Sequence, residues 1–270
     1  MARICGLIVD YHMHLRAPDG SIDHSVEAVE PFVEVAASRG VDELGFTEHV
    51  YYFRDTRPLW SFPYHVERCV YALDVDVDAV VEAKRKGMPV KLGLEVDYVP
   101  GREAETAELL RGYPWDYLLG SVHYLGDHSI DAEPSLVGAV GTEEAWRRYY
   151  RALTNAAPSG LFDVLAHPDL VKMHGGEIAW TWDDVVAGLD GVCLEVSSSG
   201  LHKPHGKLYP NGDLLAAARR RDVPITLASD AHEPQNVGRD VDRAIEHARA
   251  AGYDTITVFE GRNARQEPLG

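Results

Sequence analysis

Cysteine is scarce in this chain of 270 residues: Cys5, Cys69 and Cys193 are widely spaced, and no pair forms a CxxC motif. An odd number of scattered cysteines argues against a disulfide framework and is typical of a reduced, cytoplasmic protein. No apolar run approaches the roughly 20 residues that a membrane-spanning helix needs. The first apolar segment has no small-residue cleavage site after it. We therefore expect a cytoplasmic protein with no membrane partner.

Positively charged residues are also few. The chain has 26 Lys and Arg against 43 Asp and Glu, which gives a formal net charge of −17. A surface that binds nucleic acid needs a basic stripe to meet the phosphate backbone, so we expect no nucleic-acid partner. Part of the acidic excess is available to bind cations instead.

Eight short apolar runs, each of strand length and bounded by Gly, Pro or Asp, divide the sequence. They are CGLIVDYH, ELGFTEH, VKLGLEVDY, DYLLGSVHYL, FDVLAHPDLV, GVCLEVSSSG, PITLASDAH and TITVFEG. Amphipathic helical patterns lie between several of them, at 25–40, 77–89, 141–157, 212–224 and 237–253. Strands that alternate with helices predict an α/β fold with a parallel sheet. Seven or eight such units favour a closed or nearly closed barrel over an open sheet.

Two stretches interrupt this alternation and are predicted to be long loops, at 50–69 and 197–213. Long loops in compact domains are more often functional than accidental. The sequence has no internal repeat, low-complexity tract or linker, so we expect one domain over residues 1–270.

Metal-ligating residue types recur where the predicted strands end. In an extended strand, residues i and i+2 project from the same face, so His12 with His14, and Asp230 with His232, each direct two side chains to one point. Other strand ends carry the same residue types: Glu48, His49, Glu95, Asp97, His123 and His167. The carboxyl ends of parallel barrel strands share the face on which barrel active sites lie. Imidazoles and carboxylates gathered there predict a site for two or three divalent ions, of Zn, Mn or Fe.

The remaining histidines are interpreted differently. Six of them lie in predicted helices or loops away from the strand ends, and we expect structural or surface roles for them: His24, His65, His128, His174, His205 and His247.

The motifs DYHMH, GFTEH, GLEVDY, LGSVHYL, LAHPDL, SSSGLHKP and ASDAH, in this order, resemble the polymerase and histidinol phosphatase (PHP) family, and within it the histidinol-phosphate phosphatase branch. The resemblance runs from residue 9 to the C-terminal tail ITVFEGRNARQEPLG. It implies a distorted (β/α)7 TIM-like barrel with a trinuclear metal centre at the C-terminal ends of the strands.

The resemblance also implies a ligand set. One ion would be held by His12, His14, Glu95 and Asp230, and a second would share Glu95 and add His123 and His167. A third would be held by His49 and His232, with Asp19 as the partner. Asp19, Asp230 and His232 would act in catalysis: a water that bridges two ions attacks phosphorus, and Asp19 or a water on the third ion protonates the leaving alkoxide. Glu48 and Asp97 would orient the ligands.

A phosphate ester also needs cations near the ions. The candidates for substrate binding are Arg16, Arg54, Lys172, His202 and Lys203. The loop after the sixth strand departs from the branch, because Ser197 and His202 stand where the branch has Asn and Arg. Losing an Arg fork changes how an anion is recognised.

The leading interpretation is a metal-dependent phosphomonoesterase whose partner is a small phosphorylated metabolite. L-histidinol phosphate, an intermediate of histidine biosynthesis, is the best single substrate. One alternative is a paralogue acting on another amino-alcohol, sugar or nucleoside phosphate. A second is an amidohydrolase-type metal hydrolase, which would not need His49 or His232. A third is a metal-stabilised binding module without turnover.

Overall fold

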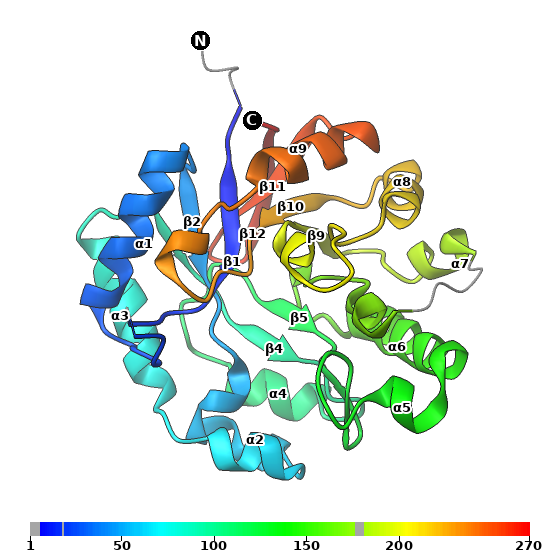
Figure 1. Cartoon of the computed structure of the whole chain (residues 1–270). Coiled ribbons are helices and arrows are strands. Elements are labelled where there is room, and N and C mark those ends of the chain that lie inside the picture. Colours follow the sequence, from blue (N-terminus) through cyan, green and yellow to red (C-terminus); the bar gives the residue numbers. More distant parts are fainter. Residues whose placement is uncertain (1–5, 18, 176–180) are drawn as a thin grey trace.

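The computed structural model describes residues 6–17, 19–175 and 181–270. Two parallel sheets form its centre (Figure 1). The smaller sheet has the order β1-β2-β3, with β1 at Val9–Met13, β2 at Glu43–Phe46 and β3 at Val90–Leu92. The larger has the order β10-β9-β8-β5-β4, with strands at Ile225–Ala228, Cys193–Ser197, Val164–Leu165, Leu119–Ser121 and Glu95–Asp97. The chain is therefore an α/β protein with parallel sheets, as the alternating pattern predicts.

The two sheets are joined at two places. Beyond β1 and β10, a parallel bridge joins Met13 to Ala231, and the amide of His14 donates to the carbonyl of Ala231 over 2.8 Å. On the other side, a parallel bridge joins His49 to Glu95, whose amide donates to the carbonyl of Glu48 over 3.0 Å. These bridges bring the carboxyl ends of strands from both sheets together.

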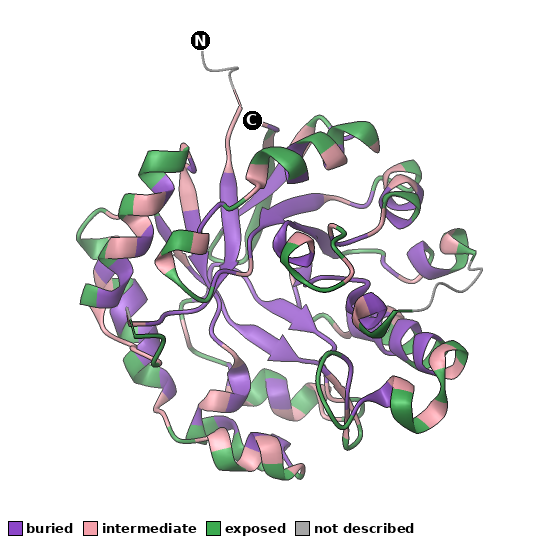
Figure 2. Cartoon of the chain, in the orientation of Figure 1, coloured by how far each residue is buried: buried purple, intermediate pink, exposed green. Residues whose placement is uncertain are grey.

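Helices surround the strands, with their buried faces inward and their exposed faces toward solvent (Figure 2). Local signals set their ends: the Ser25 hydroxyl caps the first helix by accepting from the amide of Ala28, and Gly40, at φ 74°, ends it. The described helices are α1 at Val26–Arg39, α2 at Pro63–Arg68, α3 at Leu73–Arg85, α4 at Glu103–Leu109, α5 at Leu136–Val140, α6 at Thr142–Ala156, α7 at Trp182–Val186, α8 at Gly212–Arg220 and α9 at Val241–Ala250. None of these described helices combines the length and apolar character needed to cross a membrane.

The core beneath the strand ends is aromatic and closely packed. The hydroxyl of Tyr117 donates to the carbonyl of Tyr11 over 2.6 Å, and the Tyr117 ring stacks on Phe259. A Cβ on Gly45 would lie 1.8 Å from the Tyr117 hydroxyl oxygen, so only glycine fits at this point of β2. This packing fixes β1 and β2, which carry the first ligand residues.

Each of the eight apolar runs contains a strand, and all five predicted helices are present. The last run differs from the expectation of a parallel strand: β11, at Thr255–Glu260, pairs antiparallel with β12, at Asn263–Pro268. Gly261 and Arg262 between them have φ values of 54° and 63°, the backbone of a tight hairpin turn.

The predicted loop at 50–69 is also largely helical, which corrects the expectation of an irregular segment. It holds the 3-10 helices η1 (Val50–Tyr52) and η2 (Arg54–Leu59), followed by α2. Proline suits the first turn of a helix because its missing N–H is not needed there, and Pro63 is the first residue of α2. Cys69 and Cys193 are free thiols, and Cys5 lies outside the described residues.

Candidate metal centre

Eight of the nine predicted metal ligands lie together where the two sheets meet. They form four groups, and within each group one ligand atom per residue lies within 4.8 Å of the others. The groups are His12, His14 and Asp230; His12, Glu95 and His167; His49, Glu95 and His123; and His14, His49 and His232. We call these eight residues the floor of the site. The strand-end pattern in the sequence therefore corresponds to one cluster in space.

The backbone is unusual at two floor positions. His167, just after β8, has φ 27°, and Asp230, just after β10, has φ 53°. Non-glycine residues seldom adopt positive φ, and such residues persist only where the surrounding structure holds them, often at functional sites. The local chain is bent here in a way that brings these two side chains into the cluster.

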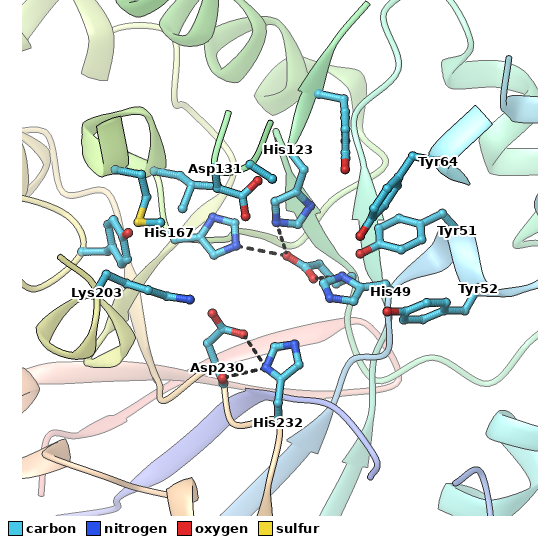
Figure 3. A pocket seen from close by; sticks show the side chains of 16 residues that line it. His49, Tyr51, Tyr52, Tyr64, His123, Asp131, His167, Lys203, Asp230 and His232 are labelled. Carbon is cyan, nitrogen blue, oxygen red and sulfur yellow. Dashed lines mark hydrogen bonds and ion pairs between the residues drawn. The ribbon is translucent and has the colours of Figure 1, made fainter. Parts of the chain in front are cut away.

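Glu95 lies at the centre of the floor and is fully buried. Its Oε1 lies 3.1 Å from His167 Nε2 and 3.3 Å from His123 Nε2. Its Oε2 lies 2.6 Å from His49 Nδ1 and 3.5 Å from His12 Nε2. Figure 3 shows His49, His123 and His167 pointing toward one another. With His14 Nε2 at 3.8 Å from Oε2, five imidazoles surround this carboxylate, which is therefore placed to bridge two cations.

Three floor histidines are each held from behind by a carboxylate on Nδ1, which leaves Nε2 toward the centre. The pairs are His12 with Glu195 at 2.7 Å, His14 with Glu48 at 3.1 Å and His123 with Asp97 at 3.0 Å. Carboxylates in this position fix the tautomer and orientation of metal-ligating histidines. Glu48 and Asp97 occupy the orienting positions expected from the sequence.

Glu195 is a site residue that the sequence reasoning missed. It is fully buried in β9, and besides holding His12 its Oε1 accepts from the amide of His167 over 3.1 Å. The signal was available, because an acid in the middle of the apolar run GVCLEVSSSG must find a partner in the core.

A second layer of charge lies behind Glu48. The guanidinium of Arg16 pairs with its carboxylate, and Nε2 of His24 lies 3.6 Å from Glu48 Oε2 and 3.8 Å from Asp76 Oδ1. Burial raises the pKa of Asp76 to about 7, and His24 only partly opposes this shift. His24, expected to be structural, therefore contacts the residue that holds a floor histidine.

The chemistry of the floor fits divalent metal ions. Among the described residues, the buried Nε2 atoms of His12 and His14 and the Oε2 of Glu95 make no hydrogen bond, although such atoms normally have partners. Burial lowers the pKa of His12, but the carboxylates of Glu195, Glu95 and Asp230 raise it well above its usual value. Burial likewise opposes protonation of His123, yet Glu95 and Asp97 raise its pKa to about 10. The acids therefore attract positive charge to this point, and imidazole and carboxylate together suit Zn, Mn or Fe.

The ninth predicted ligand, Asp19, lies elsewhere. It is exposed, its Oδ1 accepts from the amide and the hydroxyl of Ser21 over 3.0 and 2.6 Å, and it belongs to none of the groups formed by the described residues. Its roles as a metal ligand and proton donor stay predictions.

A pocket of about 250 Å³ opens above the floor (Figure 3). Tyr51 and Tyr209 form its buried walls. Its outer edge, which we call the rim, consists of partly or fully exposed residues: Tyr52, Tyr64, Tyr124, Asp131 and Lys203. A neighbouring cavity of about 330 Å³ shares Lys203, Asp230 and His232 and is also lined by His202 and Arg239. The floor is thus reached from a space large enough for a small organic phosphate.

The five candidate substrate cations are placed in different environments. Lys203 lines both cavities. His202 lines the neighbouring cavity, with Nε2 2.7 Å from Asp240 Oδ2. Arg54 is exposed and lines neither of these two cavities.

Arg16 and Lys172 are buried and lie against other protein groups. Arg16 pairs with Glu48, as described above. The ammonium of Lys172 donates to Asp169 over 2.9 Å and to the carbonyl of Leu208 over 2.6 Å. Neither residue lines the pocket above the floor, whereas Lys203 does.

Comparisons with known proteins give a consistent result. The family model for the PHP domain matches residues 10–199. A probable histidinol-phosphatase from Deinococcus radiodurans is 32% identical, over 97% of this chain and 99% of the relative. The histidinol-phosphatase of Bacillus subtilis is 27% identical, over 85% and 95%. A crystal structure of histidinol phosphate phosphatase from Lactococcus lactis, complexed with zinc, L-histidinol and phosphate, superposes with a TM-score of 0.74 at 19% identity, covering 96% of this chain and 98% of that one.

Proposed function

Because the chain belongs to the PHP domain family, we propose that it is a metal-dependent phosphomonoesterase that hydrolyses L-histidinol phosphate to L-histidinol and phosphate. The observation that carries this proposal is the floor, where eight ligand residues converge and three histidines are each held by a carboxylate. The substrate is supported by the names of the relatives, which are histidinol-phosphatases matched over nearly their whole length.

Two or three divalent ions would be held by the floor. His12, His14, Glu95 and Asp230 would hold one, Glu95, His123 and His167 a second, and His49 and His232 a third. Bound ions would neutralise the phosphoryl oxygens and make water acidic enough to act as a nucleophile near neutral pH. Burial, together with the charge of His14, lowers the pKa of His232 to about 3. A neutral imidazole suits a ligand role at this position better than that of a proton donor.

The remaining pocket residues would bind and orient the ester. The ammonium of Lys203 is the candidate cation that lines both cavities, and it would meet the phosphate oxygens beside Asp230. The tyrosines at 51, 52, 64 and 124 would flank the organic part of the substrate and exclude water from it.

The architecture proposed with this function is one domain, a distorted (β/α)7 barrel. The bridges between Met13 and Ala231 and between His49 and Glu95 support it, since they would join the two sheets into a ring. This ring has seven strands when β3 and β4, which follow one another closely in the chain, are taken as one. A reduced cytoplasmic setting is supported by the free thiols of Cys69 and Cys193, and the absence of a nucleic-acid partner by the net charge of −17.

One observation favours a second candidate, a related phosphatase for another amino-alcohol phosphate. At the position where the branch has Arg, His202 lies against Asp240 rather than in the pocket above the floor. Phosphate recognition would then differ from that of the branch, and with it the range of esters accepted.

Phosphate release from a panel of esters tests the proposal. The metal-loaded protein should hydrolyse L-histidinol phosphate best, and Asp230→Asn should abolish turnover. Asp222→Asn is the matched control, because Asp222 is exposed just before the other end of β10 and should leave the rate unchanged. Turnover confined to other esters would reassign the substrate, whereas no release from any ester with metal bound would overturn the phosphatase.

A further inference from the structure

Asp131 is an acid of the pocket that the proposed chemistry does not use. It lies in the loop that follows the short hairpin of β6 (Tyr124–Leu125) and β7 (His128–Ser129). Its carboxylate lines the pocket near the floor histidines 123 and 167 and across from Lys203 (Figure 3).

Backbone contacts fix Asp131 relative to the floor. The amide of Ile130, the preceding residue, donates to the carbonyl of His123 over 2.7 Å. The Ser129 hydroxyl donates to Asp131 Oδ1 over 2.9 Å and accepts from the amides of Asp131 and Ala132. The carboxylate is therefore held at a set distance from the metal ligand His123, although the loop itself is exposed.

The carboxylate of Asp131 differs from the other acids of the pocket in its contacts. Among the described residues, no Lys, Arg or His forms an ion pair with it, and it belongs to none of the four ligand groups. The other two carboxylates that line the pocket, Glu95 and Asp230, both contact floor histidines. Asp131 is thus the pocket acid that keeps its negative charge available to a ligand.

The surroundings of Asp131 suit a cation. Tyr64 and Tyr124, whose ring centroids lie 5.5 Å apart, present aromatic surface to the same pocket, and aromatic faces attract ammonium groups. Lys203 on the opposite side would repel a cation and attract an anion. The pocket therefore has a positive side and a negative side, and would orient a molecule that carries phosphate at one end and an amine at the other.

We propose that Asp131 binds the protonated amine of the substrate's organic part and so determines specificity for phosphate esters of amino alcohols. This inference rests on the proposed phosphatase function and adds to it the group by which the leaving alcohol is recognised. A hydrogen bond to a charged group contributes enough to change binding about ten- to a hundredfold.

A pair of esters that differ only in the amine tests the role of Asp131. The substrates are L-histidinol phosphate and its des-amino counterpart, 3-(imidazol-4-yl)propyl phosphate, assayed with metal-loaded wild type and Asp131→Asn. We expect the variant to lose about ten- to a hundredfold in kcat/KM on the amine ester, mainly through KM, and less than about twofold on the des-amino ester. Glu133→Gln is the control, since this exposed acid of the same loop does not line the pocket. It should change neither ester.

Other outcomes would overturn the inference in recognisable ways. An equal loss on both esters would show that Asp131 acts on the metal centre or on the shape of the loop, and metal content per chain would distinguish these two causes. No change on either ester would show that the carboxylate does not contact substrate. If the wild type hydrolysed neither ester, the proposed function itself would fail, and this inference with it.

Discussion

The floor and the rim of the site are built in different ways. Five of the eight floor residues are buried, and their imidazoles and carboxylates contact one another within a few ångströms. The rim residues are partly or fully exposed, and two of them, Asp131 and Lys203, are opposite charges that lie apart. A buried network with fixed partners gives geometry that tolerates little change, whereas an exposed edge can vary without unfolding the protein. The floor would therefore supply the chemistry and the rim would select the substrate.

The largest effect should come from the centre of the floor. Glu95→Gln removes the negative charge that five histidines share, so we expect the protein to lose bound metal and at least about a thousandfold of kcat/KM. Metal content per chain and phosphate release measure the two losses. Glu43→Gln is the control, because Glu43 begins β2 and belongs to none of the four ligand groups of the described residues. Near-normal activity of the Glu95 variant would contradict a bridging role.

The second effect concerns the stability of the folded protein and depends on Asp76, which lies behind the floor beside His24. Folded Asp76 has a pKa of about 7, raised by burial from 3.8, so between these values the folded protein holds a proton that the unfolded chain has released. Stability therefore falls as the pH rises through this window, by an amount on the order of 4 kcal/mol. Asp76→Asn cannot titrate, so its stability relative to wild type should increase from pH 4 to pH 7.

Urea unfolding of metal-free wild type and Asp76→Asn at several pH values measures this difference. A constant difference between the two proteins across the window would mean that Asp76 is ionised in the folded state and paired with His24. Asp76 and His24 behind the floor would then form an ion pair, and Asp76 would not be a buried neutral acid.

A smaller effect should follow from a change at Glu195, the carboxylate that holds the floor histidine His12. Glu195→Gln keeps the shape of the side chain that holds His12 but removes its charge. Such changes typically weaken metal affinity about 10- to 100-fold. Competition with a chelator of known affinity measures the loss, and Asp190→Asn, an exposed acid before the other end of β9, is the control. Unchanged metal affinity would mean that His12 is held by its backbone alone.

The smallest effect should come from the rim. Lys203→Ala removes an exposed cation, and we expect KM for the phosphate ester to rise about tenfold while kcat changes little. Initial-rate kinetics with Lys207→Ala as the control measures this, because Lys207 lies in the same loop but does not line the two cavities. A loss confined to kcat would place Lys203 in the chemical step and weaken the contrast between floor and rim.

Much of the fold and floor could be predicted from the sequence because both depend on local spacing. His12 with His14, and Asp230 with His232, follow from the two-residue period of a strand. Ligand residues at successive strand ends come together because parallel strands end on the same face. The hairpin of β11 and β12 was missed, since its turn at Gly261 and Arg262 has no common turn signal.

The partners of charged side chains were less predictable, because they lie far apart in the sequence. Arg16 was a candidate for substrate phosphate, yet it pairs with Glu48, 32 residues away. Glu195 contacts His12 across 183 residues, and only its place in an apolar strand hinted at a partner. Asp131 lies in a loop with no motif. Its relevance emerged only when the fold brought it to the pocket that Lys203 also lines.

The most direct test of this account is to add metal stepwise to metal-free protein and to follow phosphate release from L-histidinol phosphate against metal bound per chain. The account predicts no turnover without metal and a rate that rises with metal until at least two ions are bound per chain. Full turnover by the metal-free protein, or a fully loaded protein that releases no phosphate, would contradict it.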